Sequence, residues 1–221
     1  LTYVINPIMH PILSDYQNDK AYIYRSYLKV VKLLSLLGVF ISAYCFWSGE
    51  EIIMLFFGRQ WTASVQLFQL LSLAVWPQLV STSAGAIYQS TGNTRMMFKS
   101  GTVHFNTTII LIVVGVMYGH LETLALLVAI SLYLRFFIDY YFLVVRVFSY
   151  SYVSFLKEFF ADAVIMLALM IVISVFPGIR ILGILIRMVF KGVILVAVYM
   201  AAIMLTGQFR ILKDILKKLK K

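Results

Sequence analysis

Residues 181–205 read ILGILIRMVFKGVILVAVYMAAIML, and this run contains only two charged side chains, Arg187 and Lys191. A helix that crosses the hydrocarbon core of a bilayer needs about 20 mostly apolar residues, and this stretch is long enough. Its hydrophobic residues are continuous and do not alternate with polar ones, which excludes a strand of a membrane β-barrel. The stretch is therefore predicted to be a transmembrane helix.

The composition of the whole chain indicates the same class. Of the 221 residues, 62% are hydrophobic and 13% are charged, against roughly half and a quarter in a soluble globular domain. The mean hydropathy is +0.93, so there is too little polar surface to cover a water-soluble globule. These values exclude a cytosolic enzyme, a secreted disulfide scaffold and a nucleic-acid-binding domain. The single cysteine, Cys45, cannot form a disulfide within the chain.

Five further apolar stretches resemble the first, and turn residues such as Ser48-Gly49 and Gly92-Asn93 separate them. The predicted transmembrane helices span residues 30–47, 65–88, 101–118, 121–145, 159–176 and 181–205. Residues 1–206 would form a helical bundle, and residues 207–221 a basic amphipathic tail on the membrane surface. The predicted fold class is an all-α integral membrane protein with six transmembrane helices.

The basic residues are distributed unevenly between the two sides of this bundle. Fourteen of the 19 Lys and Arg residues lie in segments on one side, whereas the segments on the other side contain only Arg59 and Arg180. Short loops rich in Lys and Arg face the cytoplasm in membrane proteins. We therefore expect residues 93–99 and the C-terminus to be cytoplasmic, and residues 49–60 and 177–180 to be external.

Few residues suggest catalysis. The three histidines, His10, His104 and His120, are scattered along the chain and lack the spacing of a metal site. Glu50 and Glu51 are adjacent carboxylates, and we interpret them as solvated residues at the membrane surface rather than an acid–base pair. No catalytic residue, metal site or cofactor is predicted, and the sequence argues against an enzyme.

Four charged residues at membrane depth are the candidate substrate-binding residues. Arg135 and Asp139 are four residues apart in the fourth predicted span, and Arg187 and Lys191 have the same spacing in the sixth, so each pair shares a helix face. A charge near the bilayer centre costs about 2.5–3.5 kcal/mol on insertion scales. Arg135 and Asp139 could neutralise each other or face a lumen, and Arg187 could extend to the outer surface. Arg187 and Lys191 have no acid on their own helix, which suits an anionic ligand group such as a phosphate or carboxylate.

The second predicted span contains Trp76-Pro77 together with small and hydroxyl-bearing residues. A proline inside a helix frees a backbone carbonyl and kinks the helix, and small residues let helices approach closely. This pattern fits a helix in a moving bundle, and it also fits one in an immobile packed bundle.

Three separate stretches, in this order along the chain, resemble a known family. They are NPIMHPILSDYQND (residues 6–19), EEIIMLFFGRQW (residues 50–61) and SVQLFQLLSLAVWPQLVSTSAGAIYQSTGNTRMMFKSG (residues 64–101). The second stretch contains Phe57, Gly58 and Trp61 in the family's Phe-Gly-x-x-Trp pattern. Taken in order, the stretches resemble the C-terminal part of polysaccharide flippases, the Wzx-like PST branch of the MOP superfamily. The resemblance covers about residues 7–101.

This resemblance implies a two-lobed helical bundle in the bacterial inner membrane, with this chain forming most of the second lobe. It implies alternating access, in which a glycan linked to undecaprenyl diphosphate turns from the inner to the outer leaflet. The implied partners are this lipid-linked glycan, membrane lipids and the N-terminal half of the same protein, with no nucleic acid. The chain begins at Leu1 without Met, and we expect it to be a fragment of that longer protein.

Three alternatives remain open from the sequence. One is a purely structural bundle, which would not need Arg187 and Lys191 at membrane depth. A drug exporter of the same superfamily, driven by Na⁺ or H⁺, would use intramembrane carboxylates, for which Asp139 and Asp162 are the candidates. A membrane-embedded enzyme of glycan assembly would carry a large outer loop or His/Asp chemistry, and the predicted outer loops are short.

Overall fold

The computed structural model describes residues 20–176 and 183–209, and within these ranges the chain forms helices and no strands. Five helical segments are long and apolar enough to cross a membrane. They are α2 (Lys20–Trp47), α7 (Thr94–Met117), α8 (Leu121–Tyr141) with the π-helical segment η2 (Phe142–Val147), α9 (Tyr152–Lys157) with α10 (Phe160–Val175), and α11 (Ile184–Leu205). The prediction of an all-helical membrane protein is confirmed.

The sixth candidate span is broken. Its first part comprises η1 (Arg59–Ser64) and α4 (Val65–Ser72), and its second part comprises α5 (Val75–Ser81) and α6 (Ala84–Ser90). The two parts meet at an angle of 48°. Counted as one span, they bring the number of helices that could cross a membrane to six, by length and composition.

Two helices extend beyond the predicted spans at their N-terminal ends. Helix α2 begins at Lys20 and α7 at Thr94, whereas the apolar runs begin near residues 30 and 101. The added turns contain basic residues among aromatic and apolar ones, so hydropathy alone does not include them, although they continue the same helices. The predicted tail at 207–221 lies outside the described residues except for 207–209, and so do the first two residues of the span at 181–205.

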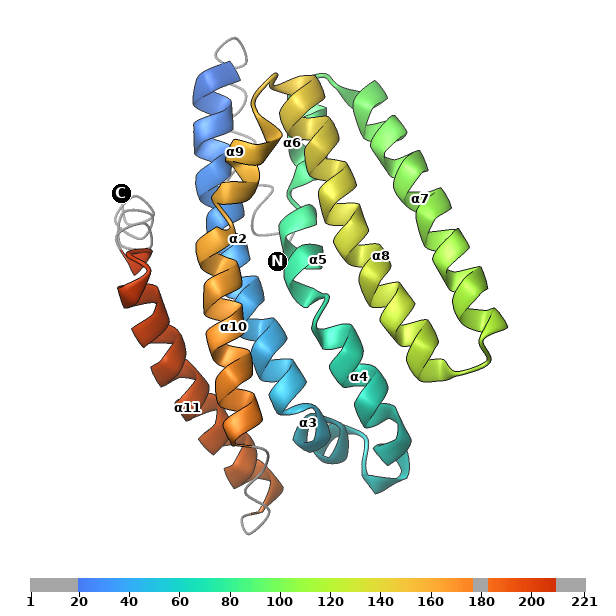
Figure 1. Cartoon of the computed structure of the whole chain (residues 1–221), viewed down its shortest axis with the longest axis vertical. Helices are drawn as coiled ribbons and strands as arrows, with labels where there is room; N and C mark the ends of the chain where they lie inside the picture. The colour runs from blue at the N-terminus through green and yellow to red at the C-terminus, as the bar shows by residue number, and fades with distance from the viewer. Residues whose placement is uncertain (1–19, 177–182, 210–221) are drawn as a thin grey trace.

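The helices run roughly along the long axis of the molecule (Figure 1). Helix α2 is central, because it contacts α4, α5, α10 and α11. Helix α8 contacts α4, α5 and α7, and α7 packs mainly against α8 at one edge of the bundle. Helices α10 and α11 form the other edge (Figure 1). The broken helix therefore lies between α2 and α8, where both can bond to its backbone.

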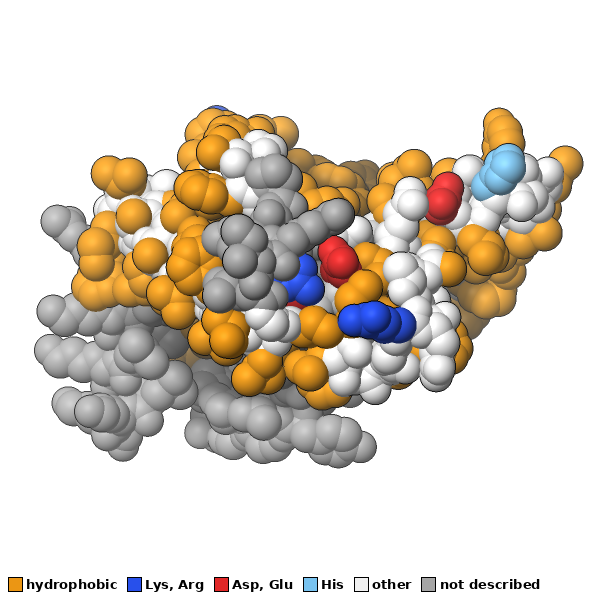
Figure 2. All heavy atoms as spheres, turned by 90° about the horizontal axis from the view of Figure 1, so that it is seen from below, with side chains coloured by type: hydrophobic (Ala, Val, Ile, Leu, Met, Phe, Trp, Pro, Cys, Tyr) orange, Lys and Arg blue, Asp and Glu red, His pale blue; other side chains and the backbone are white. Residues whose placement is uncertain are grey.

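One end of the bundle is basic. It contains the start of α2, the turn between α6 and α7, and the connection from α8 to α9 (Figure 1). The basic residues of these segments are Lys20, Arg25, Lys29, Arg95, Lys99, Arg146 and Lys157. The opposite end contains α3 (Gly49–Phe56) and the turn between α7 and α8. Figure 2 shows this opposite end with few charged side chains among hydrophobic ones.

Single cysteines test which end faces the cytoplasm. In a protein whose Cys45 is replaced by serine, we expect Arg59→Cys and His120→Cys to react with an impermeant maleimide in intact cells, and Arg95→Cys to react only after lysis. All three positions are exposed, and the basic end should remain inside. Labelling at 95 but not at 59 or 120 in intact cells would show that the protein has the opposite orientation.

Candidate functional site

Four salt bridges occur among the described residues, and they form three clusters inside the bundle. Two of the clusters join helices that are far apart in the chain, and the other one lies within α8. The clusters are Glu51 with Lys191 and Arg187, Arg135 with Asp139, and Lys32 with Asp162. The four candidate residues found from the sequence belong to the first two clusters, and the third was not predicted as a site.

The first cluster is centred on Glu51, whose side chain is 1% exposed. Lys191 Nζ lies 2.7 and 2.9 Å from the two carboxylate oxygens of Glu51 and also donates to the Trp47 carbonyl at 2.8 Å. Arg187 Nε lies 3.8 Å from the same carboxylate. A single acid from α3 therefore faces both cations of α11.

This arrangement corrects two expectations. Arg187 and Lys191 are not uncompensated cations, and Glu51 is a buried ion-pair partner rather than a solvated surface residue. The reason is the close packing of α3 beneath the bundle. A Cβ at Gly49 would lie 2.7 Å from Gln69 Cγ, so the glycine lets the start of α3 approach α4. The same first turn of α3 then presents Glu51 to α11.

The two cations in this cluster are not equivalent. Lys191 makes three short hydrogen bonds and is buried. Arg187 Nε is buried and has no hydrogen-bond partner in the part of the chain that the structure describes, and its side chain is 13% exposed. One carboxylate therefore serves two cations, which leaves a net positive charge on the cluster. Lys191 is the tightly bound partner, and Arg187 keeps binding capacity for a further acceptor.

The second cluster is the pair within α8. Arg135 Nε lies 3.3 Å from Asp139 Oδ2, as the four-residue spacing allows. Ser100 Oγ of α7 donates to Asp139 Oδ1, and Tyr88 of α6 donates to the Asp139 backbone carbonyl at 2.9 Å. The Asp139 side chain is 11% exposed and that of Arg135 is 33% exposed. Of the two possibilities left by the sequence, the structure shows Arg135 and Asp139 paired with each other.

Replacing Asp139 by asparagine should therefore destabilise the protein by about 1–2 kcal/mol. The substitution weakens the bond from Ser100 and leaves Arg135 without its acid, but Arg135 is exposed enough to find other partners. Thermal unfolding of the purified protein in detergent measures the change. The double variant Arg135→Gln with Asp139→Asn should regain most of the loss. Two losses that simply add would contradict an energetic coupling between the two residues.

The third cluster joins three parts of the chain around Asp162, whose side chain is fully buried. Lys32 Nζ of α2 lies 2.9 Å from Asp162 Oδ1 and also donates to the Glu158 carbonyl. Ser35 Oγ donates to Asp162 Oδ2, and Gln208 Nε2, after α11, donates to Oδ1 at 2.8 Å. The carboxylate thus ties α10 to α2 and to the segment that follows α11.

The sequence contained a weak signal for this cluster. Lys32 and Ser35 are three residues apart on α2 and so share a face, and both interrupt an apolar stretch. The charge distribution counts Lys32 among the cytoplasmic basic residues, at the mouth of the first predicted span. In the structure, α2 begins more than three turns before it, and Lys32 is buried. Asp162 was considered only as a carboxylate for cation coupling.

Pro77 explains the break between α4 and α5. A proline lacks the N–H that would bond to the carbonyl four residues earlier, which here belongs to Leu73. The hydroxyl of Tyr133 on α8 donates to that carbonyl at 3.0 Å. The backbone N–H of Trp76 finds an acceptor in Ser42 Oγ of α2, at 2.9 Å. Hydroxyls from both neighbouring helices therefore replace the bonds that the break removes.

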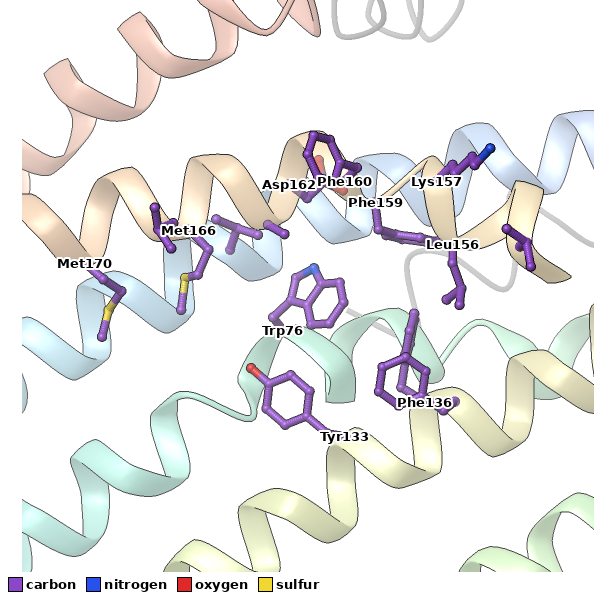
Figure 3. Close-up of a pocket in the computed structure, with 15 residues that line it drawn as sticks. Trp76, Tyr133, Phe136, Leu156, Lys157, Phe159, Phe160, Asp162, Met166 and Met170 are labelled. Atoms are coloured by element: carbon purple, nitrogen blue, oxygen red, sulfur yellow. The ribbon is translucent and has the colours of Figure 1, made fainter.

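The break places Trp76 beside a cavity that Asp162 also lines. Trp76 Nε1 donates to Ser35 Oγ at 2.7 Å, and Ser35 in turn donates to Asp162. The cavity has a volume of about 690 Å³ and is lined by α2, α5, α8, α9 and α10, which is within the usual range for a ligand pocket. Figure 3 shows the ring of Trp76 next to that of Tyr133, with ring centroids 6.0 Å apart, and Met166 and Met170 on α10. A polar cluster and an apolar cavity therefore adjoin at the broken helix.

Residues 1–66 match the family model described as "Polysaccharide biosynthesis protein". No curated protein and no solved structure matches the chain. The match supports the resemblance at the level of polysaccharide biosynthesis. It includes α2 and α3, and therefore Lys32, Ser35 and Glu51, which supply one side of two of the three clusters. Within the described ranges, no group of three or more His, Cys, Asp or Glu side chains is placed to hold a metal ion.

Proposed function

We propose that the protein exports lipid-linked oligosaccharide, the repeat unit of a polysaccharide, across the bacterial inner membrane by alternating access. In this proposal it is a flippase of the MOP superfamily, and the chain forms most of the second lobe. The lipid carrier is undecaprenyl diphosphate, and the remaining partners are membrane lipids and the N-terminal half of the same protein. The C-terminus faces the cytoplasm.

The observation that carries this proposal is the family match over residues 1–66. The matched segment contains α2, which contacts α3, α4, α5, α10 and α11, and two residues, Lys32 and Glu51, whose ion pairs hold the bundle together. A likeness to polysaccharide biosynthesis proteins therefore falls on residues that build the core of a membrane bundle. A membrane bundle in polysaccharide biosynthesis suits the step in which the lipid-linked intermediate crosses the bilayer.

The broken span supports a transport role. Discontinuous transmembrane helices are common at the binding sites of transporters, where irregular backbone lines a cavity. Here Leu73 and Trp76 flank the break, their backbone groups are bonded by side chains of α2 and α8, and Trp76 lines a cavity. Hydroxyl groups can exchange such bonds more easily than a continuous helix can exchange its own, so the two halves of the span can change their angle.

The ion pairs favour a flippase over a cation-coupled drug exporter. An exporter of that kind needs an intramembrane carboxylate available to a proton or Na⁺. Asp139 is held by Arg135 and Ser100, and Asp162 by Lys32, Ser35 and Gln208. Both candidate carboxylates therefore already have a cation and at least one hydrogen-bond donor.

A flipping assay tests the proposal. The complete protein is reconstituted in vesicles that contain a fluorescent oligosaccharide linked to undecaprenyl diphosphate, and a reductant added outside quenches the exposed leaflet. We expect the protected inner-leaflet signal to be lost rapidly with the protein and slowly without it. Equal rates would refute the proposal. A changed glycan, detected by mass spectrometry of the extracted lipid, would instead indicate an enzyme of glycan assembly.

The role of the N-terminal half has its own test. The 221 residues alone should insert into a membrane, because each helix satisfies its own backbone hydrogen bonds, but they should not flip the lipid. Flipping by this chain alone at the rate of the complete protein would contradict the assignment to one lobe of a two-lobed carrier.

A further inference from the structure

The cavity beside the broken helix has walls that offer almost nothing to a polar ligand. Thirteen of its fifteen lining residues are hydrophobic, and the other two are Lys157 and Asp162. The Asp162 carboxylate already pairs with Lys32 and accepts hydrogen bonds from Ser35 and Gln208. The indole N–H of Trp76 is bonded to Ser35, and the Tyr133 hydroxyl is bonded to the Leu73 carbonyl. A sugar would lose its bonds to water in this cavity and find few replacements.

The shape of the cavity suits a hydrocarbon chain. Its wall on α9 and α10 runs from Val153 to Met170, and the α10 part alone, from Phe160, corresponds to about 15 Å at 1.5 Å per helical residue. That length is about half of the hydrocarbon core of a bilayer. Phenylalanine and methionine side chains line this wall, and methionine adapts its shape to irregular apolar partners. The walls therefore match a flexible, branched apolar chain better than a compact solute.

A basic residue marks one end of the cavity. Lys157 ends α9 at the basic end of the bundle, is exposed, and makes no salt bridge among the described residues. Its stem lines the cavity, and Figure 3 shows its amino group turned away from the aromatic rings. Lysine often buries its stem while its amino group stays at the polar surface. Glu158 follows it in the chain but does not line the cavity.

We propose that this cavity binds the isoprenoid chain of the lipid carrier, with the phosphate of its head group next to Lys157. The inference rests on the proposed function, because that function supplies a lipid carrier whose chain must be accommodated while its head group crosses the membrane. The apolar walls bind the chain, and Lys157 selects lipids with an anionic head group. The glycan itself does not enter this cavity.

Photocrosslinking in the complete protein tests this inference. The photoreactive amino acid p-benzoylphenylalanine replaces either Phe160, which lines the cavity, or Val164, which lies one turn further along α10 and does not. Both positions are exposed. The vesicles contain phosphatidylethanolamine and phosphatidylglycerol with a small fraction of radiolabelled polyprenyl phosphate that carries no glycan. We expect labelling from position 160 to exceed that from position 164 several-fold.

Two further substitutions test the parts of the site. Ala163→Trp should fill the cavity and reduce labelling from position 160 to the level of position 164, whereas Val164→Trp should leave it unchanged. Lys157→Gln should reduce labelling by polyprenyl phosphate but not by radiolabelled polyprenol, which lacks the charge. If Lys157→Gln has no effect on either probe, the head-group assignment is wrong.

Three outcomes would overturn the proposal. They are equal labelling at positions 160 and 164, capture of phospholipid in proportion to its abundance, and a crosslink from position 160 to another part of the protein. The assay is separable from the flipping assay, because its probe carries no glycan. Flipping without preferential labelling would refute the cavity assignment alone. Labelling without flipping would leave a lipid site and refute the proposed function.

Discussion

Replacing Glu51 by glutamine is expected to destabilise the protein by about 3–5 kcal/mol, the usual result of removing one partner from a buried ion pair. Lys191 would keep its bond to the Trp47 carbonyl, but its buried charge would lose both short contacts with the carboxylate. Thermal unfolding in detergent, together with the yield of monodisperse protein, measures the loss. Glu50→Gln is the matched control, because Glu50 is adjacent, less buried and without a salt bridge among the described residues.

A second substitution separates loss of charge from loss of packing. Glu51→Gln combined with Lys191→Met removes both charges and keeps a long apolar side chain on α11, so it should recover most of the stability. Arg187→Met in the wild-type background should cost less than Lys191→Met, because Arg187 makes the longer contact and is more exposed. If Glu51→Gln proves as stable as Glu50→Gln, Glu51 does not stabilise the bundle.

Asp162→Asn is expected to have an effect of similar size, about 3–5 kcal/mol. Asp162 is the fully buried member of its cluster. Once its negative charge is removed, the Glu158 carbonyl is the remaining strong acceptor for the Lys32 ammonium among the described residues. The bonds from Ser35 and Gln208 would weaken as well, because a neutral amide oxygen accepts less strongly than a carboxylate. The fraction of folded protein after heating, measured by size-exclusion chromatography, provides the comparison.

Exposed neighbours provide the controls for this second prediction. Glu158→Gln and Lys29→Met change charges close to the cluster in the chain, at exposed positions, and should each change stability by less than about 0.5 kcal/mol. Asp162→Asn combined with Lys32→Met should be more stable than Asp162→Asn alone. A double variant that is even less stable would show that Lys32 acts independently of Asp162.

The ion pairs explain how a bundle with such apolar helices acquires a specific arrangement. Apolar side chains pack against lipid about as well as against each other, so they give little preference for one neighbouring helix over another. The Glu51 cluster ties α3 to α11 at one end, and the Asp162 cluster ties α2 to α10 nearer the basic end. Helices α2, α3, α10 and α11 are thus joined at two levels, whereas the broken helix is held to α2 and α8 by hydroxyl groups.

Local features of the sequence were sufficient for the fold class. The apolar runs predicted the membrane-spanning helices, because the bilayer requires a certain length and hydropathy of any helix that crosses it. Pro77 predicted an interruption in the second span, since a missing N–H affects the carbonyl four residues away in any helix. The spacing of Arg135 and Asp139 allowed their pairing for the same reason, because residues four apart share a helix face.

Only the tertiary structure decided the partners of Lys191 and Asp162. Glu51 and Lys191 are 140 residues apart, and their contact depends on how α3 turns beneath the bundle and on the rotation of α11 about its axis. Lys32 and Asp162 likewise meet because α2 and α10 cross with these faces together. Hydropathy and residue spacing describe each helix separately, and they contain no information on how one helix is rotated relative to another. The sequence therefore identified Arg135, Asp139, Arg187 and Lys191 as charges within apolar runs. The packing determined that Glu51 and Lys32 are buried as well, and which charges neutralise each other.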